Sequence, residues 1–214
     1  MVAQSEISQA KTRQQLIEAA GEVFAEHGYR AATVREICMR AGANVASIHY
    51  HFGDKEKLYL EVLRYAHQRT AEANPELCTD NPHGAAEERL KNFVRSFLIR
   101  LLDPGIVAWD SKLLAREMVE PTVAMDVVVD ERIRPMSKRV REIVRAIIGP
   151  HATEDEIREG EFSVVSQCVF YHNCREVIAR LYPKYKIAGP EIDKLADHIT
   201  AFSLAGLKAK GKRK

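Results

Sequence analysis

Residues 33–52 read TVREICMRAGANVASIHYHF, and they contain the clearest structural pattern of the sequence. Thr33-Val-Arg-Glu36 has the spacing of a capping box, which opens a short helix, and Gly42 supplies the C-terminal stop of that helix. Asn44 has a side chain suited to cap a second short helix, which runs to the end of the stretch. Two short helices joined by a tight turn that contains glycine indicate a helix-turn-helix motif.

Helical patterns continue on both sides of this motif. Upstream, Thr12-Arg-Gln-Gln15 predicts the start of a helix of about four turns, in which apolar residues recur at helical spacing until Gly28 ends it. Downstream, Asp54 is expected to cap a helix that continues towards Asn74. We therefore expect a three-helix helix-turn-helix domain over residues 10–72.

The rest of the chain is also patterned as helices. Residues 73–84 contain two prolines, a glycine and two asparagines, which predict a linker. A larger helical domain is expected over residues 85–207, followed by a basic tail at 208–214. Helices are expected at residues 85–102, 111–120, 122–148, 154–181 and 191–208, and Pro135 should kink or break the third of them. Because no alternating strand pattern appears, the predicted fold class is all-α.

The composition is that of a soluble globular protein. Of 214 residues, 46% are hydrophobic and 29% are charged, and no apolar run approaches the roughly 18 residues that a membrane helix requires. The first residues lack the basic start and the apolar core of a secretory signal, so we expect no membrane association and a cytoplasmic location. Five positive charges fall in the last seven residues, so the body of the chain is not basic. Nucleic-acid binding therefore has to come from a local patch.

The motif and its flanks resemble a known family. Residues 20–63, AGEVFAEHGYRAATVREICMRAGANVASIHYHFGDKEKLYLEVL, look like the DNA-binding domain of tetracycline-repressor-type (TetR) transcriptional regulators. The resemblance combines Phe-x-x-x-Gly-Tyr, Thr-Val-x-x-Ile, Ala-Gly, and Tyr-His-Phe followed by Asp-Lys-x-x-Leu. Two positions depart from the family pattern, because His49 stands where tyrosine or phenylalanine is usual and Asn44 stands where serine is usual. The base preference of a relative therefore does not carry over to this chain.

The resemblance implies roles in DNA binding for seven residues. Those expected to meet phosphates or base edges are Thr33, Arg35, Ser47, His49, Tyr50, His51 and Lys55. The second helix of the domain should receive phosphate at its start, where free backbone N–H groups and the helix dipole favour anions. Ser47 and His49 should face the floor of the groove, and Lys55 should clamp a phosphate. A metal site at His49 and His51 is not expected, because residues i and i+2 of a helix point roughly 200° apart.

The C-terminal region resembles one TetR subgroup more weakly. Trp109-Asp-Ser-Lys-Leu-Leu-Ala-Arg-Glu-Met, Glu120-Pro-Thr-x-Ala and Ile133-Arg-Pro look like regulators of cefoperazone and chloramphenicol sensitivity. In the family this region holds a ligand pocket and, in its last two helices, a dimer interface. Candidate pocket residues are Phe93, Phe97, Trp109, Leu113, Arg116, Met125, Phe170 and His172, although core packing or a surface ion pair also explains each of them. Candidate dimer residues are Val165, Val169, Ile199 and Phe202.

These observations predict a homodimeric repressor that binds a pseudo-palindromic double-stranded DNA operator until a small-molecule effector releases it. The alternative is an architectural DNA-binding dimer that responds to no ligand, which would leave the large C-terminal domain unexplained. An enzyme is not expected, because the sequence has no nucleophile elbow, zinc-protease motif, phosphate-binding loop or dinucleotide fingerprint. No cofactor and no metal are expected.

Overall fold

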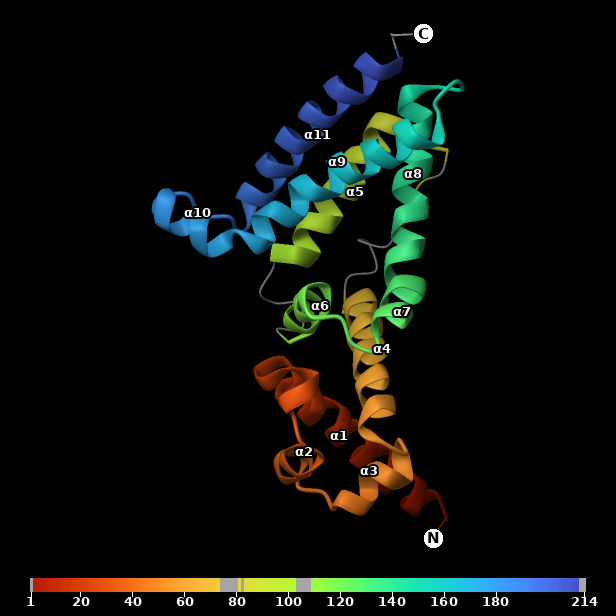
Figure 1. The fold of residues 1–214 in the computed structure, drawn as a ribbon, viewed down its shortest axis with the longest axis vertical. Helices are drawn as coiled ribbons and strands as arrows, with labels where there is room; N and C mark the ends of the chain where they lie inside the picture. The colour runs from red at the N-terminus through yellow and green to blue at the C-terminus, as the bar shows by residue number, and fades with distance from the viewer. Residues whose placement is uncertain (1, 74–80, 82, 103–108, 212–214) are drawn as a thin grey trace. The chain divides into compact units, whose positions relative to one another are not determined.

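The computed structural model describes residues 2–73, 81, 83–102 and 109–211, and every regular element in them is helical (Figure 1). The elements are α1 (Val2–Ala31), α2 (Val34–Ala41), α3 (Val45–His51), α4 (Lys55–Ala73), α5 (Ala86–Leu102), α6 (Asp110–Val119), α7 (Met125–Val128), a π-helical turn η2 (Val129–Ile133), α8 (Arg134–Ile148), α9 (Glu154–Asn173), α10 (Arg175–Leu181) and α11 (Pro190–Gly211). The predicted all-α class is confirmed.

The chain divides into two compact units. The N-terminal unit combines Met1–Glu72 with Val107–Arg132, and the C-terminal unit combines Ala73–Ile106 with Ile133–Lys214. Helices α6 and α7 therefore belong to the same unit as the helix-turn-helix, although they follow α5 in sequence. The single boundary expected at residues 73–84 does not describe this grouping, and that linker lies mostly outside the described residues.

The N-terminal unit is built on the apolar face of α1, which packs on α2. Gly28, at φ 78°, interrupts α1 at the predicted stop. The predicted start at Thr12 is wrong, because α1 begins at Val2. The residues upstream of Thr12 contain neither glycine nor proline, so nothing in them ends a helix. Fully buried side chains of this core are Leu16, Ile17, Val23, Phe24, Ile37, Ile48, Leu58 and Val62.

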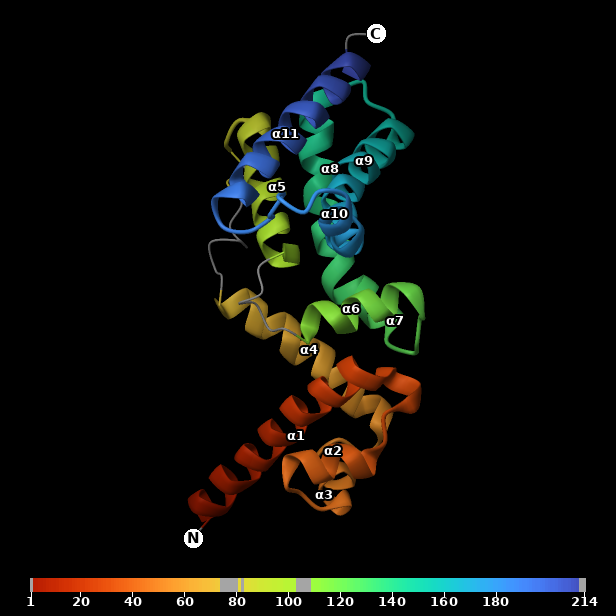
Figure 2. The same cartoon turned by 90° about the vertical axis from the view of Figure 1, so that its left-hand side faces the viewer.

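The C-terminal unit is a bundle of α5, α8, α9 and α11, which contact one another along their apolar faces (Figure 2). Its core includes Leu90, Phe93, Val94, Leu98, Val140, Ile143, Val144, Ile157, Val164, Cys168, Leu195 and Ile199. A capping box between Thr153 and Glu156 starts α9. None of the helices in the described part of the chain is long and apolar enough to cross a membrane.

Two long helices expected from the sequence are interrupted. The helix predicted at 122–148 contains η2 directly before α8, and Pro135 lies in the first turn of α8, where a missing N–H leaves no hydrogen bond unmade. The helix predicted at 154–181 breaks at Cys174, so α10 is a separate element. At the other end of the unit, the expected basic tail continues α11 as far as Gly211, and residues 212–214 lie outside the described residues.

Candidate nucleic-acid interface

The caps of α2 and α3 form as the sequence predicts. The Thr33 hydroxyl accepts a hydrogen bond from the Glu36 N–H at 3.2 Å, and Asn44 Oδ1 accepts one from the Ala46 N–H at 3.0 Å. Gly42 adopts the left-handed conformation at φ 63°, which ends α2. These local contacts set the ends of α2 and α3 within residues 33–52.

The inward side of α3 anchors it to the unit. Ile48 is fully buried and Phe52, at the end of the helix, is nearly so. The opposite side of α3 is open: the Tyr50 side chain is 70% exposed, His49 is exposed and Ser47 is half-buried. Helix α3 therefore presents phenol, imidazole and hydroxyl groups around the side that faces away from Ile48, and such groups can contact base edges and phosphates.

One ring nitrogen of His49 makes a hydrogen bond within the protein. His49 Nδ1 lies 2.7 Å from the carbonyl oxygen of Gly53, and because a carbonyl only accepts, Nδ1 carries the hydrogen. Nε2 of the neutral ring is then an acceptor. An acceptor at this position is complementary to the amino groups of adenine and cytosine in the major groove.

The other predicted DNA residues occupy different environments. Arg35 is exposed on the first turn of α2, next to Thr33, whose hydroxyl is committed to the cap. His51 is half-buried, and its ring packs edge-on against Tyr50 with centroids 4.9 Å apart. Both α2 residues thus lie at a helix start, while His51 is less accessible than His49 and Tyr50.

Lys55 points towards the protein. Its Nζ donates to the carbonyl of Ala32 at 2.8 Å and to that of Arg30 at 3.4 Å, and it lies 4.7 Å from the centre of the Tyr29 ring. Burial lowers the pKa of this ammonium group. In this structure Lys55 closes the end of α1, and its role as a phosphate clamp stays a prediction.

Lys57 is a second lysine of the same turn, which the sequence did not single out. Its side chain is 68% exposed in the first turn of α4 and pairs with Asp54 across 3.7 Å. Asp54 Oδ1 in turn accepts from the Lys57 backbone N–H at 2.8 Å, which confirms Asp54 as the cap of α4. The signal was present in the sequence, since two lysines follow Asp54, but spacing alone did not say which one faces outward.

Helices α6 and α7 are tied to α1 and α4 of the same unit. The Tyr59 hydroxyl donates to Glu117 Oε2 at 3.0 Å, and both side chains are buried. Burial and the neighbouring Glu117 carboxylate raise the pKa of Tyr59, so the phenol stays a neutral donor. The backbone N–H and hydroxyl of Thr122 also donate to Glu117. Three donors therefore satisfy a carboxylate that is fully removed from water.

Further contacts join the same elements. The Trp109 ring packs over Gly21 and stacks on Tyr65, and Arg116 donates to the carbonyl oxygen of Glu26 at 3.0 Å. The Arg64 guanidinium holds the Glu131 carboxylate with two nitrogens. A further ion pair joins Asp110 and Arg132 at 2.9 Å. We call these contacts, together with the Tyr59–Glu117 hydrogen bond, the α6–α7 clasp.

The eight predicted pocket residues are divided between the two units. Trp109, Leu113, Arg116 and Met125 belong to the N-terminal unit, whereas the other four belong to the C-terminal unit. Phe93 and Phe97 stack with each other at 5.5 Å as part of the bundle core, Phe170 is exposed, and His172 Nδ1 bonds the carbonyl of Leu101 at 2.8 Å. A ligand pocket lined by residues of this set stays a prediction.

The predicted dimer residues divide in a different way. Phe202 on α11 is 67% exposed, and Val165 and Val169 on α9 are half-buried. Ile199 is only 1% exposed and packs in the bundle core, so it has no surface to offer a second chain and that assignment is wrong. Phe162 and Phe170 on α9, which were not among the predicted dimer residues, are each more than half exposed. Among the described residues, no group of three or more potential metal ligands occurs.

Comparison with known proteins places both parts of the chain. Residues 16–62 match the family described as bacterial regulatory proteins, tetR family, and residues 86–207 match the C-terminal domain of HTH-type transcriptional dual regulator CecR. The chain is 28% identical over 176 residues to CecR of Shigella flexneri, covering 78% of each chain. It is 27% identical over 177 residues to the HTH-type transcriptional repressor NicS of Pseudomonas putida, covering 79% of each.

A solved structure shares the fold. A TetR-like transcriptional regulator from Rhodococcus sp. RHA1 superposes with a TM-score of 0.59 at 18% identity, covering 92% of this chain and 95% of the other. At this identity the likeness concerns the fold alone.

Proposed function

The chain belongs to the TetR family of bacterial transcriptional regulators, in the group with a CecR-type C-terminal domain, and we propose that it is a repressor that a small molecule releases from a two-fold symmetric operator. Members of this family are DNA-binding transcriptional regulators and not enzymes. The observation that supports the proposal is the exposed polar side of α3. This helix lies between two capped helix starts, at Asn44 and at Asp54. Ser47 and His49 are the base-reading residues of the proposal, and Arg35, Tyr50 and Lys57 are its phosphate contacts.

A homodimer is part of the proposal because α9 and α11 leave large apolar side chains in water. Phe162, Phe170 and Phe202 are exposed on the two helices, and exposed apolar patches of this kind favour association. Most homodimers have two-fold symmetry, and a dimer of heads then reads two half-sites related by the same axis. The proposed operator is palindromic for this reason.

The proposed response to a ligand rests on how the chain divides into its two compact units. Helices α6 and α7 lie within the region that matches the CecR C-terminal domain, yet the α6–α7 clasp joins them to α1 and α4, which belong to the same unit as the helix-turn-helix. A ligand that binds better to one arrangement of the C-terminal region shifts the population of head arrangements by its difference in affinity. DNA must then weaken ligand binding by the same factor.

The proposal is tested by selecting genomic DNA fragments with the purified full-length protein. We expect recovered fragments to share an inverted repeat, and Ser47→Ala or His49→Ala to change which fragments are recovered. Small molecules are then screened for release of the selected operator, measured by fluorescence anisotropy. Fragments without a common sequence would contradict an operator-specific repressor, and an operator affinity that no small molecule changes would favour the architectural alternative.

A further inference from the structure

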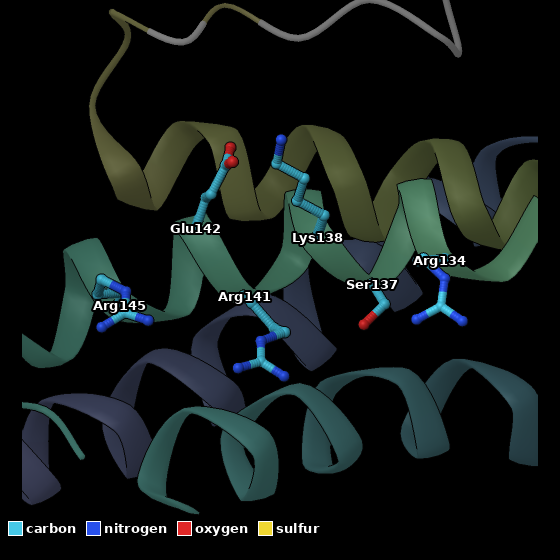
Figure 3. A pocket seen from close by; sticks show the side chains of 6 residues that line it. All are labelled: Arg134, Ser137, Lys138, Arg141, Glu142 and Arg145. Carbon is cyan, nitrogen blue, oxygen red and sulfur yellow. The ribbon is translucent and has the colours of Figure 1, made fainter. Parts of the chain in front are cut away.

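A groove of about 310 Å³ runs along α8 and is lined mainly by arginine and lysine side chains (Figure 3). Arg141 and Arg145 of this groove both bind the Glu154 carboxylate of α9, so these guanidinium groups already have an anionic partner. The situation on α3 is different. In the described part of the chain, no hydrogen-bonding group of the protein reaches Nε2 of His49, whose side chain is exposed.

The ring of His49 is held by the turn that ends α3. Gly53 has a φ of 87°, in the left-handed region, and its N–H donates to the carbonyl oxygens of Ile48 and His49 at 3.1 Å each. Ile48 is fully buried and Phe52 is nearly so, which anchors this turn in the core of the unit. The Gly53 carbonyl oxygen is thereby held 2.7 Å from His49 Nδ1.

This contact decides which ring nitrogen carries the hydrogen. A carbonyl oxygen only accepts, so Nδ1 is the donor, and a neutral imidazole has one donor and one acceptor. The exposed Nε2 therefore presents a lone pair. A tyrosine or phenylalanine, the residues usual at this position in the family, has no such restriction, because a phenol both donates and accepts and a phenyl ring does neither.

A fixed acceptor distinguishes bases by their exocyclic groups. In the major groove, adenine and cytosine present amino groups, which donate, whereas guanine and thymine present O6 and O4, which accept. An acceptor gains a hydrogen bond from the first two bases and faces another lone pair on the last two. Each base pair joins one amino base to one keto base, so a contact of this kind reads which strand carries the amino base.

We propose that His49 selects an amino base at one position of each half-site. Nε2 accepts a hydrogen bond from N6 of adenine or N4 of cytosine, and guanine and thymine are disfavoured on that strand. Because His49 departs from the family pattern, this preference belongs to the chain itself. The inference rests on the proposed operator binding through α3 and adds the class of base that the helix reads.

The first measurement needs no DNA. Nitrogen-15 NMR of the full-length protein with labelled histidine distinguishes the Nδ1–H form, the Nε2–H form and the doubly protonated ring. The spectrum of His49→Ala identifies the His49 signals among those of the eight histidines. We expect the Nδ1–H form under the conditions of the DNA-binding assay, and either of the other two forms overturns the proposal.

The second measurement uses the operator obtained by fragment selection. The base pair at which His49→Ala relaxes the preference should carry adenine or cytosine on one strand. Replacing that base with an analogue that lacks the amino group, purine for adenine or 2-pyrimidinone for cytosine, should weaken binding about three- to tenfold, the effect of one hydrogen bond. The same analogue should change binding of His49→Ala by less than about twofold, because the acceptor is already gone.

His51→Ala is the matched control, because it removes a half-buried histidine of the same helix. This variant should keep the full loss caused by the analogue. His49→Lys gives the inverse result: lysine only donates, so guanine or thymine should become the preferred base at that position. Circular dichroism of each variant confirms that the helices are retained.

The outcomes separate this inference from the proposed function. If the fragments share an inverted repeat but His49→Ala relaxes no position, or relaxes one that carries guanine or thymine on both half-site strands read, operator binding stands and the role of His49 is wrong. An equal effect of the analogue on the parent protein and on His49→Ala also overturns it. Fragments without a common sequence overturn the proposed function and this inference together.

Discussion

Replacing Gly21 with alanine should destabilise the protein, although alanine is the better helix former. In the interior of an exposed helix this change gains about 1 kcal/mol. At Gly21, however, the new Cβ would lie 2.7 Å from Cε2 and Cζ2 of Trp109. Carbon atoms pack best at about 3.5–4.0 Å, so the indole ring has to move by roughly 1 Å. Overpacking of this kind costs about 1–3 kcal/mol, which leaves a net loss of roughly 0–2 kcal/mol.

The assay is urea unfolding followed by circular dichroism, combined with tryptophan fluorescence. Trp109 is the only tryptophan in the chain, so its emission reports this contact alone and should shift to the red in Gly21→Ala. In a Trp109→Leu background the clash is absent, and Gly21→Ala should then stabilise by up to about 1 kcal/mol. A Gly21→Ala protein that is more stable than the parent, with unchanged emission, would refute the close packing of α6 on α1.

Three further outcomes follow from contacts described above. Tyr59→Phe removes a hydrogen-bond donor from the buried Glu117 carboxylate and should lower the free energy of unfolding by about 1.5–3 kcal/mol, seen as a fall in Tm of about 3–12 °C. An unchanged Tm would mean that this carboxylate is satisfied without Tyr59. Phe202→Glu should halve the mass measured by light scattering while keeping the helical signal, and a retained dimer would place the interface elsewhere. Lys57→Ala should weaken binding to specific and to random DNA alike, and it should lower the salt dependence of the binding constant by about one per head. Lys55→Ala should lower Tm and leave that salt dependence unchanged. The reverse pattern would identify Lys55 as the phosphate contact.

Features set by neighbouring residues were predictable from the sequence. Thr33, Gly42 and Asn44 each act within a few residues of their own position, so a pattern in the sequence is enough to place the helix-turn-helix. The two lysines after Asp54 mark the limit of such reasoning. Both lie in the first turn of α4, and only the packing of Tyr29 against Lys55 decides that Lys57 is the exposed one.

Features that depend on distant contacts were not predictable. Ile199 and Phe202 are three residues apart on a broad apolar stripe of α11, and periodicity does not divide that stripe between the core and an exposed face. The sequence also did not show that the candidate pocket residues are divided between two compact units. Gly21 is instructive, because a glycine inside a helix indicates a close approach without naming the partner.

The N-terminal unit is discontinuous in sequence, and this affects how it folds while the chain is being synthesised. Residues up to Glu72 leave the ribosome first, but the helices that complete their unit extend to Arg132. At about 5–20 residues per second, the first helices wait about 3–12 s before α6 and α7 have been made. During that interval α5 is made as well, and its apolar face is also without partners. The nascent DNA-binding head is therefore exposed to wrong contacts and to chaperones until Trp109 reaches Gly21.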